Sequence, residues 1–263
     1  MSRLSDDIER LCQAHRRGSD LVLLFDYDGT LAPFADHPSQ ATLPVQTRAL
    51  LTYFVTVPRV IPGIISGRKL EDLMNVVRIP GLFYAGTSGL ELDLRGQRVV
   101  QQLPEEDRQT ISDAAEGLNE IIKDHPGAWV ENKGFGLTLH YRAVPPDRVE
   151  MLREQAFAFL ARRPQLKVLE GPCALEVTLR HGWNKGSAVS TIVQHIGNKP
   201  ALLYAGDEAN DEDAFATVNE LGGVSIGVGD RAPSNATHRL PDPEALVEVL
   251  QQLKATCTIA TCQ

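Results

Sequence analysis

Two aspartates separated by one residue, Asp26 and Asp28, stand directly after the apolar run 21–25 in the segment DYDGT. An apolar run that ends abruptly in acidic and small residues is typical of a buried parallel strand at the carboxyl edge of its sheet, where ligands of open α/β sheets bind. Two carboxylates this close repel each other, and a divalent cation together with a phosphate group offsets that repulsion. The alternative is an Asp/Gly turn that caps the next helix. The segment favours phosphate chemistry over a simple turn.

A second acidic segment, 207–213, also follows an apolar run and holds five acidic residues in seven positions. Asp207 stands nearest the end of that run, so it is the better candidate for a metal ligand. Glu212 and Asp213 are interpreted as charges at a helix N-terminus, which the helix dipole favours. Hard oxygen ligands with few His or Cys residues nearby favour Mg²⁺ over zinc.

Two further segments offer groups that bind phosphate. Ser66, Gly67 and Arg68 follow the apolar run 60–65, and Lys185 opens a helical pattern. A hydroxyl, backbone N–H groups near a helix start and a lysine charge together form a cradle for phosphate. Taken singly, a Ser before Gly is usually a cap or turn, and a lone Lys is usually a solvated surface charge. The prediction therefore depends on these segments meeting in space.

The elements that position these segments are predicted from five apolar runs, each closed by Gly or polar residues. The runs span 21–25, 60–65, 82–86, 201–206 and 223–229. Helical patterns at 46–57 and 68–77 alternate with the first runs, which is typical of βαβ units. The sequence predicts an α/β fold whose core is a doubly wound, Rossmann-like parallel sheet, with the polar strand ends at one edge.

The middle of the chain has a different pattern. Residues 105–123 and 147–163 repeat apolar side chains at the spacing of one helix face, and each is followed by two strand-like pieces. The four pieces are 128–131, 136–142, 166–169 and 174–178. We expect an inserted αββαββ cap domain of the α+β type at 104–182, between the core segments 1–103 and 183–263.

The composition is that of an ordinary folded protein, with 263 residues, 43% hydrophobic and 23% charged. A net charge of −8 argues against nucleic acid or an anionic membrane surface as the main partner, and no run approaches the ~18 apolar residues of a membrane span. Four cysteines without a CxxC pair predict reduced thiols and a cytoplasmic location. We interpret Cys257 and Cys262 as thiols in a frayed polar tail.

Taken together and in this order, the four polar segments resemble the four motifs of the haloacid dehalogenase-like (HAD) phosphatases. The resemblance runs from about residue 20 to about residue 230. The stretches that extend it are IISGRKLEDL, FYAGTSGLEL, ENKGFGLTLHYR, LEVTLRHGWNKGSAV and LLYAGDEANDEDAF. They are similar to successive landmarks of the trehalose-6-phosphate phosphatases, including a C2B-type cap between the second and third motifs.

This resemblance implies a sugar-phosphate substrate and a role for each core residue. Asp26 would attack phosphorus to form an aspartyl-phosphate, and Asp28 would protonate the leaving sugar oxygen and later accept a proton from water. Mg²⁺ is implied on Asp26, the backbone carbonyl of Asp28 and Asp207, with Asp211 in support. The groups implied to hold the phosphoryl oxygens are Thr30, Ser66, Gly67 and Lys185, of which Ser66 and Lys185 count as catalytic.

The resemblance also implies contacts with the sugar. The residues implied are Arg68, Glu131, Lys133, Arg142 and Glu176. An exposed hairpin with a weak surface ion pair accounts equally well for Glu131 and Lys133. We interpret His140 as a packing histidine in preference to a catalyst. Glu91 is equally consistent with a residue facing the cleft and with an exposed edge residue.

The chain departs from the family pattern at several positions outside the nucleophile and the acid/base. The segment Gly86-Thr87-Ser88-Gly89 stands where the family commonly has GxHG, so the histidine is missing, and Glu208 stands where the family commonly has the second Asp of GDD. Thr178-Leu179 replaces an Arg-Pro pair, and Pro172 replaces a common Lys. Phosphatase chemistry is expected to survive these changes, whereas the identity of the sugar is left open.

Several alternatives follow from these departures. Glucosylglycerol phosphate and sucrose phosphate are the alternative substrates. A mutase would share the aspartyl nucleophile but return the phosphoryl group to a sugar, and a catalytically silent protein would only bind a sugar phosphate. Any trehalose-6-phosphate synthase in the same pathway is expected to be a separate chain.

Overall fold

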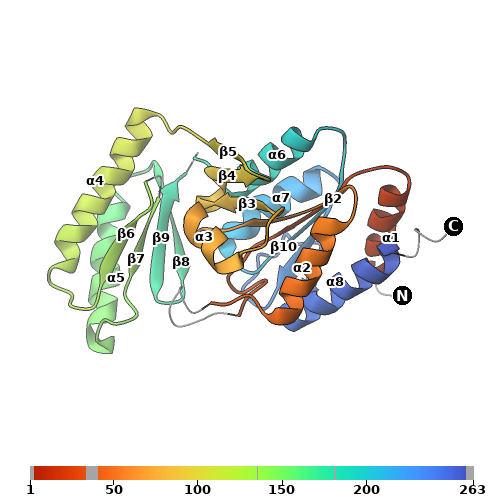
Figure 1. Cartoon of the computed structure of the whole chain (residues 1–263). Helices are drawn as coiled ribbons and strands as arrows, with labels where there is room; N and C mark the ends of the chain where they lie inside the picture. Colours follow the sequence, from red (N-terminus) through yellow and green to blue (C-terminus); the bar gives the residue numbers. More distant parts are fainter. Residues whose placement is uncertain (1–2, 34–40, 135, 181, 259–263) are drawn as a thin grey trace. The chain divides into compact units, whose positions relative to one another are not determined.

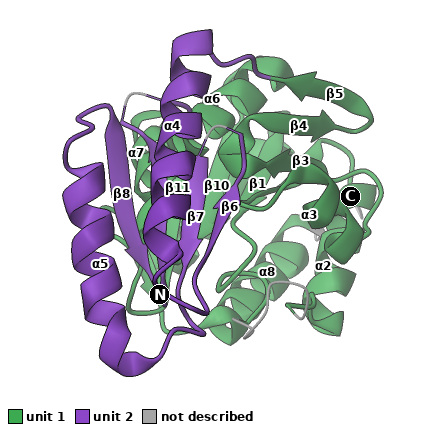
Figure 2. Cartoon of the chain, turned by 90° about the vertical axis from the view of Figure 1, so that its left-hand side faces the viewer, with its two compact units in different colours: residues 1–100, 184–263 green, residues 101–183 purple. Residues whose placement is uncertain are grey.

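The computed structural model describes residues 3–33, 41–134, 136–180 and 182–258. Cys262 lies outside these residues. The chain divides into two compact units, one made of residues 1–100 and 184–263 and the other of residues 101–183 (Figure 2). The insert expected at 104–182 falls within the second unit.

The first unit is built on an eight-stranded sheet in the order β12-β11-β10-β1-β2-β3-β4-β5 (Figure 1). Six of its strands run parallel: β1 (Leu21–Phe25), β2 (Val60–Ile65), β3 (Phe83–Gly86), β10 (Ala201–Gly206), β11 (Val224–Val228) and β12 (His238–Leu240). The predicted parallel α/β core is thereby confirmed.

One edge of the sheet is antiparallel and is formed by β4 (Glu91–Leu94) and β5 (Gln97–Val100), two strands that the apolar runs did not predict. Each strand has only four residues, and β5 is largely exposed, so neither forms an apolar run. Arg95 and Gly96 join them with φ values of 57° and 91°, the left-handed backbone that tight hairpins use.

Within the described residues, six α-helices cover the two faces of this sheet: α1 (Arg3–Arg16), α2 (Val45–Thr56), α3 (Leu70–Val77), α6 (Lys185–Ile196), α7 (Glu212–Glu220) and α8 (Pro243–Thr258). Strand β1 is buried on both sides, which is why its sequence is continuously apolar. Leu21, Leu23 and Phe25 pack with α1, α2, α3 and α8, whereas Val22 and Leu24 pack with α6 and α7. Because side chains alternate along a strand, Asp26 follows Val22 and Leu24 to the side of α6 and α7.

The strands that carry the polar segments end together. Phe25 pairs with Ala205 of β10 and with Ile64 of β2, and the N–H of Asp26 continues the ladder to the carbonyl of Ala205 at 2.9 Å. The segments that begin at Asp26, Ser66 and Asp207 therefore leave the sheet at neighbouring points, as the sequence predicted.

The second unit contains a four-stranded antiparallel sheet in the order β6-β7-β9-β8 and two helices, α4 (Glu105–Ile122) and α5 (Pro146–Leu160). The strands are β6 (Trp129–Asn132), β7 (Gly136–His140), β8 (Leu166–Gly171) and β9 (Ala174–Leu179). One face of this sheet presents Leu137, Leu139, Leu175 and Val177 to the helices, in a core with Ile111, Leu118 and Leu152. The helix and strand order is the predicted αββαββ.

None of the described helices has both the length and the apolar composition that a membrane span requires.

A close backbone approach between α6 and α7 gives a test of the core packing. A Cβ atom at Gly186 would lie 2.5 Å from the carbonyl oxygen of Asp213 and 2.6 Å from Oγ1 of Thr217. Helix propensity favours Ala over Gly by up to about 1 kcal/mol, but a clash with backbone forces the helices apart. We expect Gly186→Ala to lower the free energy of unfolding by at least about 1 kcal/mol in urea denaturation.

Gly171→Ala is the matched control, because its Cβ would have no neighbour closer than 3.8 Å. It should change stability by no more than about 0.5 kcal/mol. Equal stability of Gly186→Ala and the unsubstituted protein would contradict the packing described.

Candidate active site

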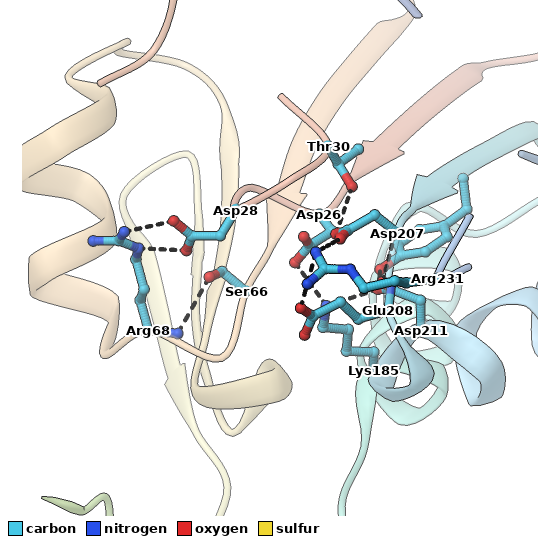
Figure 3. Close-up of polar contacts among 11 residues, drawn as sticks. Asp26, Asp28, Thr30, Ser66, Arg68, Lys185, Asp207, Glu208, Asp211 and Arg231 are labelled. Atoms are coloured by element: carbon cyan, nitrogen blue, oxygen red, sulfur yellow. Dashed lines mark hydrogen bonds and ion pairs between the residues drawn. The ribbon is translucent and has the colours of Figure 1, made fainter. Parts of the chain in front are cut away.

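A lysine buried between two aspartates forms the centre of the candidate site. Lys185 begins α6, and its Nζ donates to Oδ1 of Asp26 at 2.6 Å and to Oδ1 of Asp211 at 2.7 Å (Figure 3). The side chains are 2% exposed for Lys185 and 7% for Asp26. Asn184 and Ser187 form a capping box at this helix start, so the position of Lys185 is fixed by local structure.

Asp211 is held from several directions at once. Its Oδ1 accepts from the hydroxyl of Tyr204 at 2.6 Å as well as from Lys185, and its Oδ2 accepts from the backbone N–H groups of Asp207 at 2.9 Å and Glu208 at 3.0 Å. Both carboxylate oxygens are therefore used to fix the loop after β10 and the lysine. The role in support of a metal ion that the family resemblance implied for Asp211 stays a prediction.

The acidic residues at the ends of β1 and β10 form a cluster that could hold a metal ion. Asp26, Asp207 and Asp211 each offer a carboxylate oxygen, and these atoms lie within 4.8 Å of one another. All three side chains are buried. A donor set made of carboxylate oxygens fits a hard divalent cation.

The carboxylates of this cluster shift one another's pKa values. Burial raises the pKa of Asp26, and Asp211 and Asp207 add to that effect while the Lys185 ammonium opposes it. Burial together with the Glu208 and Asp211 carboxylates raises the pKa of Asp207 to about 7. Burial alone would lower the pKa of Lys185, but Asp211 and Asp26 outweigh it and raise that pKa. Buried carboxylates with raised pKa values repel one another when ionised, and a bound cation offsets that repulsion.

Asp207 has two further partners. Oγ1 of Thr30 donates to its Oδ1 at 3.2 Å, and Nη2 of Arg231 lies 3.0 Å from its Oδ2. The same nitrogen lies 3.3 Å from Oε1 of Glu208. The structure thus brings Thr30, predicted as a phosphate ligand, to Asp207.

Arg231 and Tyr204 were missed by sequence reasoning. Tyr204 could have been found, because strand alternation along β10 puts it on the same side of the sheet as Asp26. Arg231 lies in the loop after β11, and nothing in its local sequence marks it.

Asp28 is turned toward Arg68, apart from the Asp26 cluster (Figure 3). Nε of Arg68 donates to Oδ2 of Asp28 and Nη2 to Oδ1, both at 2.6 Å. The backbone N–H of Arg68 donates to Oγ of Ser66 at 3.2 Å, with Gly67 between them. Arg68, expected on the sugar, thus directs two of its donors to the predicted acid/base.

Ser88, which stands where the family commonly has a histidine, and Thr87 before it support this loop. Thr87 and Ser88 adopt φ values of 48° and 56°, and their N–H groups donate to the carbonyls of Arg68 at 2.6 Å and Ser66 at 2.8 Å. Glu91 accepts from Oγ1 of Thr87 at 3.1 Å and from the N–H of Leu70 at 3.2 Å. Glu91 therefore ties the start of α3 to the same turn.

In the second unit, two of the predicted sugar ligands share one face of the sheet. Glu131, Thr138 and Glu176 are directly paired across β6, β7 and β9, opposite the apolar face. Oγ1 of Thr138 is buried and makes no hydrogen bond within the part of the chain that the structure describes.

The remaining predicted residues of this unit lie near that row. His140 stacks on Trp129 with ring centroids 4.0 Å apart, and its Nε2 lies 3.1 Å from Oε2 of Glu131. Lys133 donates its backbone N–H to the carbonyl of Gly136 at 2.9 Å, closing the β6–β7 hairpin. Arg142 is exposed, two residues beyond β7.

Comparison with known proteins finds relatives that are all trehalose-phosphate phosphatases in the two examples that follow. Trehalose-6-phosphate phosphatase of Escherichia coli (strain K12) is 33% identical over 254 residues, covering 92% of this chain and 91% of that protein. Probable trehalose-phosphate phosphatase 4 of Oryza sativa subsp. japonica is 33% identical over 253 residues, covering 91% of this chain and 67% of that protein.

The fold agrees with a solved structure. The C-terminal domain of C. albicans trehalose-6-phosphate phosphatase superimposes with a TM-score of 0.76 at 24% identity, covering 95% of this chain and 96% of that one. Residues 24–244 match the trehalose-phosphatase family, and this range includes every residue of the site described above. The chain belongs to the trehalose-phosphatase family.

Proposed function

We propose that this phosphatase hydrolyses trehalose 6-phosphate to trehalose and phosphate, through an aspartyl-phosphate on Asp26 and with Mg²⁺ as cofactor. The observation that carries the proposal is the buried Asp26, held at the end of β1 by Lys185 beside Asp207. The choice of sugar rests on membership of the family.

Asp26 is proposed as the nucleophile. Lys185 fixes one of its carboxylate oxygens, so the side chain is held for attack on phosphorus. Covalent transfer to Asp26 divides one difficult displacement into two easier ones. Lys185, Ser66 and the backbone N–H of Gly67 are proposed to bind the phosphoryl oxygens. Thr30 either binds these oxygens as well or keeps its hydrogen bond to Asp207.

Mg²⁺ would be held by Asp26, Asp207 and the backbone carbonyl of Asp28, with Asp211 in support. When bound, the ion offsets the repulsion between these carboxylates and the phosphoryl oxygens. The raised pKa values of Asp26 and Asp207 support a site that binds a cation. Asp211 would act through Lys185 and the loop after β10, since donors already meet both of its oxygens.

Asp28 is proposed as the general acid that protonates the leaving sugar oxygen and as the base that then activates water. Its two hydrogen bonds to Arg68 fix the orientation of the carboxylate. We therefore assign Arg68 to orienting Asp28, in place of the direct sugar contact that the family resemblance implied.

The second unit is proposed as the domain that recognises the sugar. Glu131 and Glu176 stand on β6 and β9, the strands on either side of β7, and the unpaired hydroxyl of Thr138 on β7 lies between them. Carboxylates suit the paired hydroxyl donors of a sugar, and Lys133 and Arg142 at the margin of this face would add donors. A cytoplasmic location and a separate synthase that supplies the substrate stay predictions from the sequence.

A second candidate function is hydrolysis of a related glycosyl phosphate, such as glucosylglycerol phosphate or sucrose phosphate. The observation that favours it is the turn at Thr87 and Ser88, which holds Ser66 and Arg68 by backbone hydrogen bonds where the family commonly has a histidine.

The nucleophile can be tested by Asp26→Asn, which removes the reactive oxygen and leaves nearly the same volume. We expect phosphate release from trehalose 6-phosphate to fall by about 1,000-fold or more, with an unchanged circular dichroism spectrum. Asp93→Asn is the control: Asp93 lies in β4, an asparagine oxygen can still accept from the N–H of Gly96, and the variant should keep its activity. A near-native rate in Asp26→Asn would exclude the proposed mechanism.

The sugar site can be tested by Glu176→Ala, assayed with trehalose 6-phosphate and with a small aryl phosphate. We expect kcat/KM to fall by about 10- to 100-fold for the disaccharide, because a charged hydrogen-bond acceptor is lost, and to stay within about threefold for the aryl phosphate. Glu170→Ala is the matched control, since Glu170 is paired with Arg153 on the other face of the sheet. Equal losses on both substrates would refute the assignment.

A further inference from the structure

The first and last described helices each carry a cysteine at their common interface. Cys12 of α1 is fully buried, and Cys257 near the end of α8 packs against the same apolar cluster, so the expectation of a frayed tail is wrong at Cys257. Both residues lie outside the range 24–244 that matches the family. Neither takes part in the site described above.

The two thiols are in direct contact. The thiol of Cys12 hydrogen-bonds with the sulfur of Cys257. Beside them, Nη1 of Arg16 donates to the carbonyl of Thr256 at 3.2 Å, and Nη2 of the same arginine lies 2.5 Å from Oε1 of Glu9. The contact of Arg16 with Thr256 holds the end of α8 against α1, next to the two cysteines.

The surroundings give the two sulfurs different reactivity. The hydrogen bond from Cys12 and the charge of Arg16 lower the pKa of Cys257, against the effects of burial and Glu9. The hydrogen bond to Cys257 and burial raise the pKa of Cys12. Cys257 is half-buried and can meet a small reagent, whereas Cys12 is enclosed.

We propose that Cys12 and Cys257 are a redox-active pair that closes to an intramolecular disulfide joining α1 to α8. The oxidant is a small-molecule disulfide such as oxidised glutathione. The Cys257 thiolate attacks one of its sulfurs, the glutathione S–S bond breaks, and one glutathione leaves as a thiolate. Cys12 then loses its proton and attacks Cys257, which forms the protein disulfide and releases the second glutathione. Two protein thiols are oxidised, and one glutathione disulfide is reduced to two thiols.

The bond would link positions near the two ends of the described chain. A cross-link that closes so long a loop restricts the unfolded chain strongly, so we expect oxidation to raise Tm by about 5 to 10 °C. Turnover should change little, because α1 and α8 carry none of the proposed catalytic residues. The proposal is independent of the proposed function, since its readouts are a cross-link and a melting temperature.

The experiment treats the full chain with oxidised glutathione, maps disulfides by non-reducing peptide mass spectrometry and records Tm before and after dithiothreitol. We expect a Cys12–Cys257 peptide pair and a rise in Tm that dithiothreitol reverses. Cys173→Ser, which removes an exposed cysteine of the second unit, and Cys262→Ser should behave like the unsubstituted protein. Cys257→Ser should fold, since it alters a half-buried residue, and should show neither change.

Three results would overturn the proposal. They are a cross-link of Cys12 to Cys262 or Cys173, a mixed glutathione disulfide at Cys257 that persists without resolution by Cys12, and an unchanged Tm in a chain whose Cys12–Cys257 disulfide is complete.

Discussion

The buried ammonium group of Lys185 is the interaction on which the rest of the site depends. It is 2% exposed, and Asp26 and Asp211 lie 2.6 and 2.7 Å from its Nζ. Leaving one member of such a group without its partner costs about 3–5 kcal/mol, so the three side chains must be positioned together. Three features position these side chains. They are the strand alternation of β1 and β10, the capping box of α6 and the close approach of α6 to α7 at Gly186. The same arrangement leaves carboxylates crowded enough to favour a bound cation.

A second set of contacts fixes the other half of the site. Glu91 accepts hydrogen bonds from Thr87 and from the start of α3. The turn at Thr87 and Ser88 donates its N–H groups to the loop of Ser66 and Arg68. Arg68 in turn donates to Asp28. Strain in two left-handed residues is tolerated there because each N–H finds a carbonyl partner. At this turn, where the family commonly has a histidine, backbone hydrogen bonds from Thr87 and Ser88 hold the loop of Ser66 and Arg68.

The sequence predicted those parts of the fold and of the site that a local residue pattern determines. Buried parallel strands are continuously apolar, so β1, β2 and β10 could be found, and their polar endings identified Asp26, Ser66 and Asp207 as neighbours. The hairpin of β4 and β5 was missed because short, half-exposed strands carry little pattern. No local pattern predicts contacts between distant parts of the chain. Three such contacts are those of Arg68 with Asp28, of Arg231 with Asp207 and of Cys12 with Cys257.

The central claim is that this site is a phosphatase site specific for one disaccharide phosphate. The most direct test is kcat/KM for phosphate release, with Mg²⁺, from trehalose 6-phosphate, sucrose 6-phosphate, glucosylglycerol phosphate and glucose 6-phosphate. We expect a preference for trehalose 6-phosphate of about 100-fold or more, because a site built to hydrogen-bond sugar hydroxyls discriminates strongly against analogues that leave its polar groups unpaired. Preference for another member of the panel, or weak and equal activity on all of them, would contradict it.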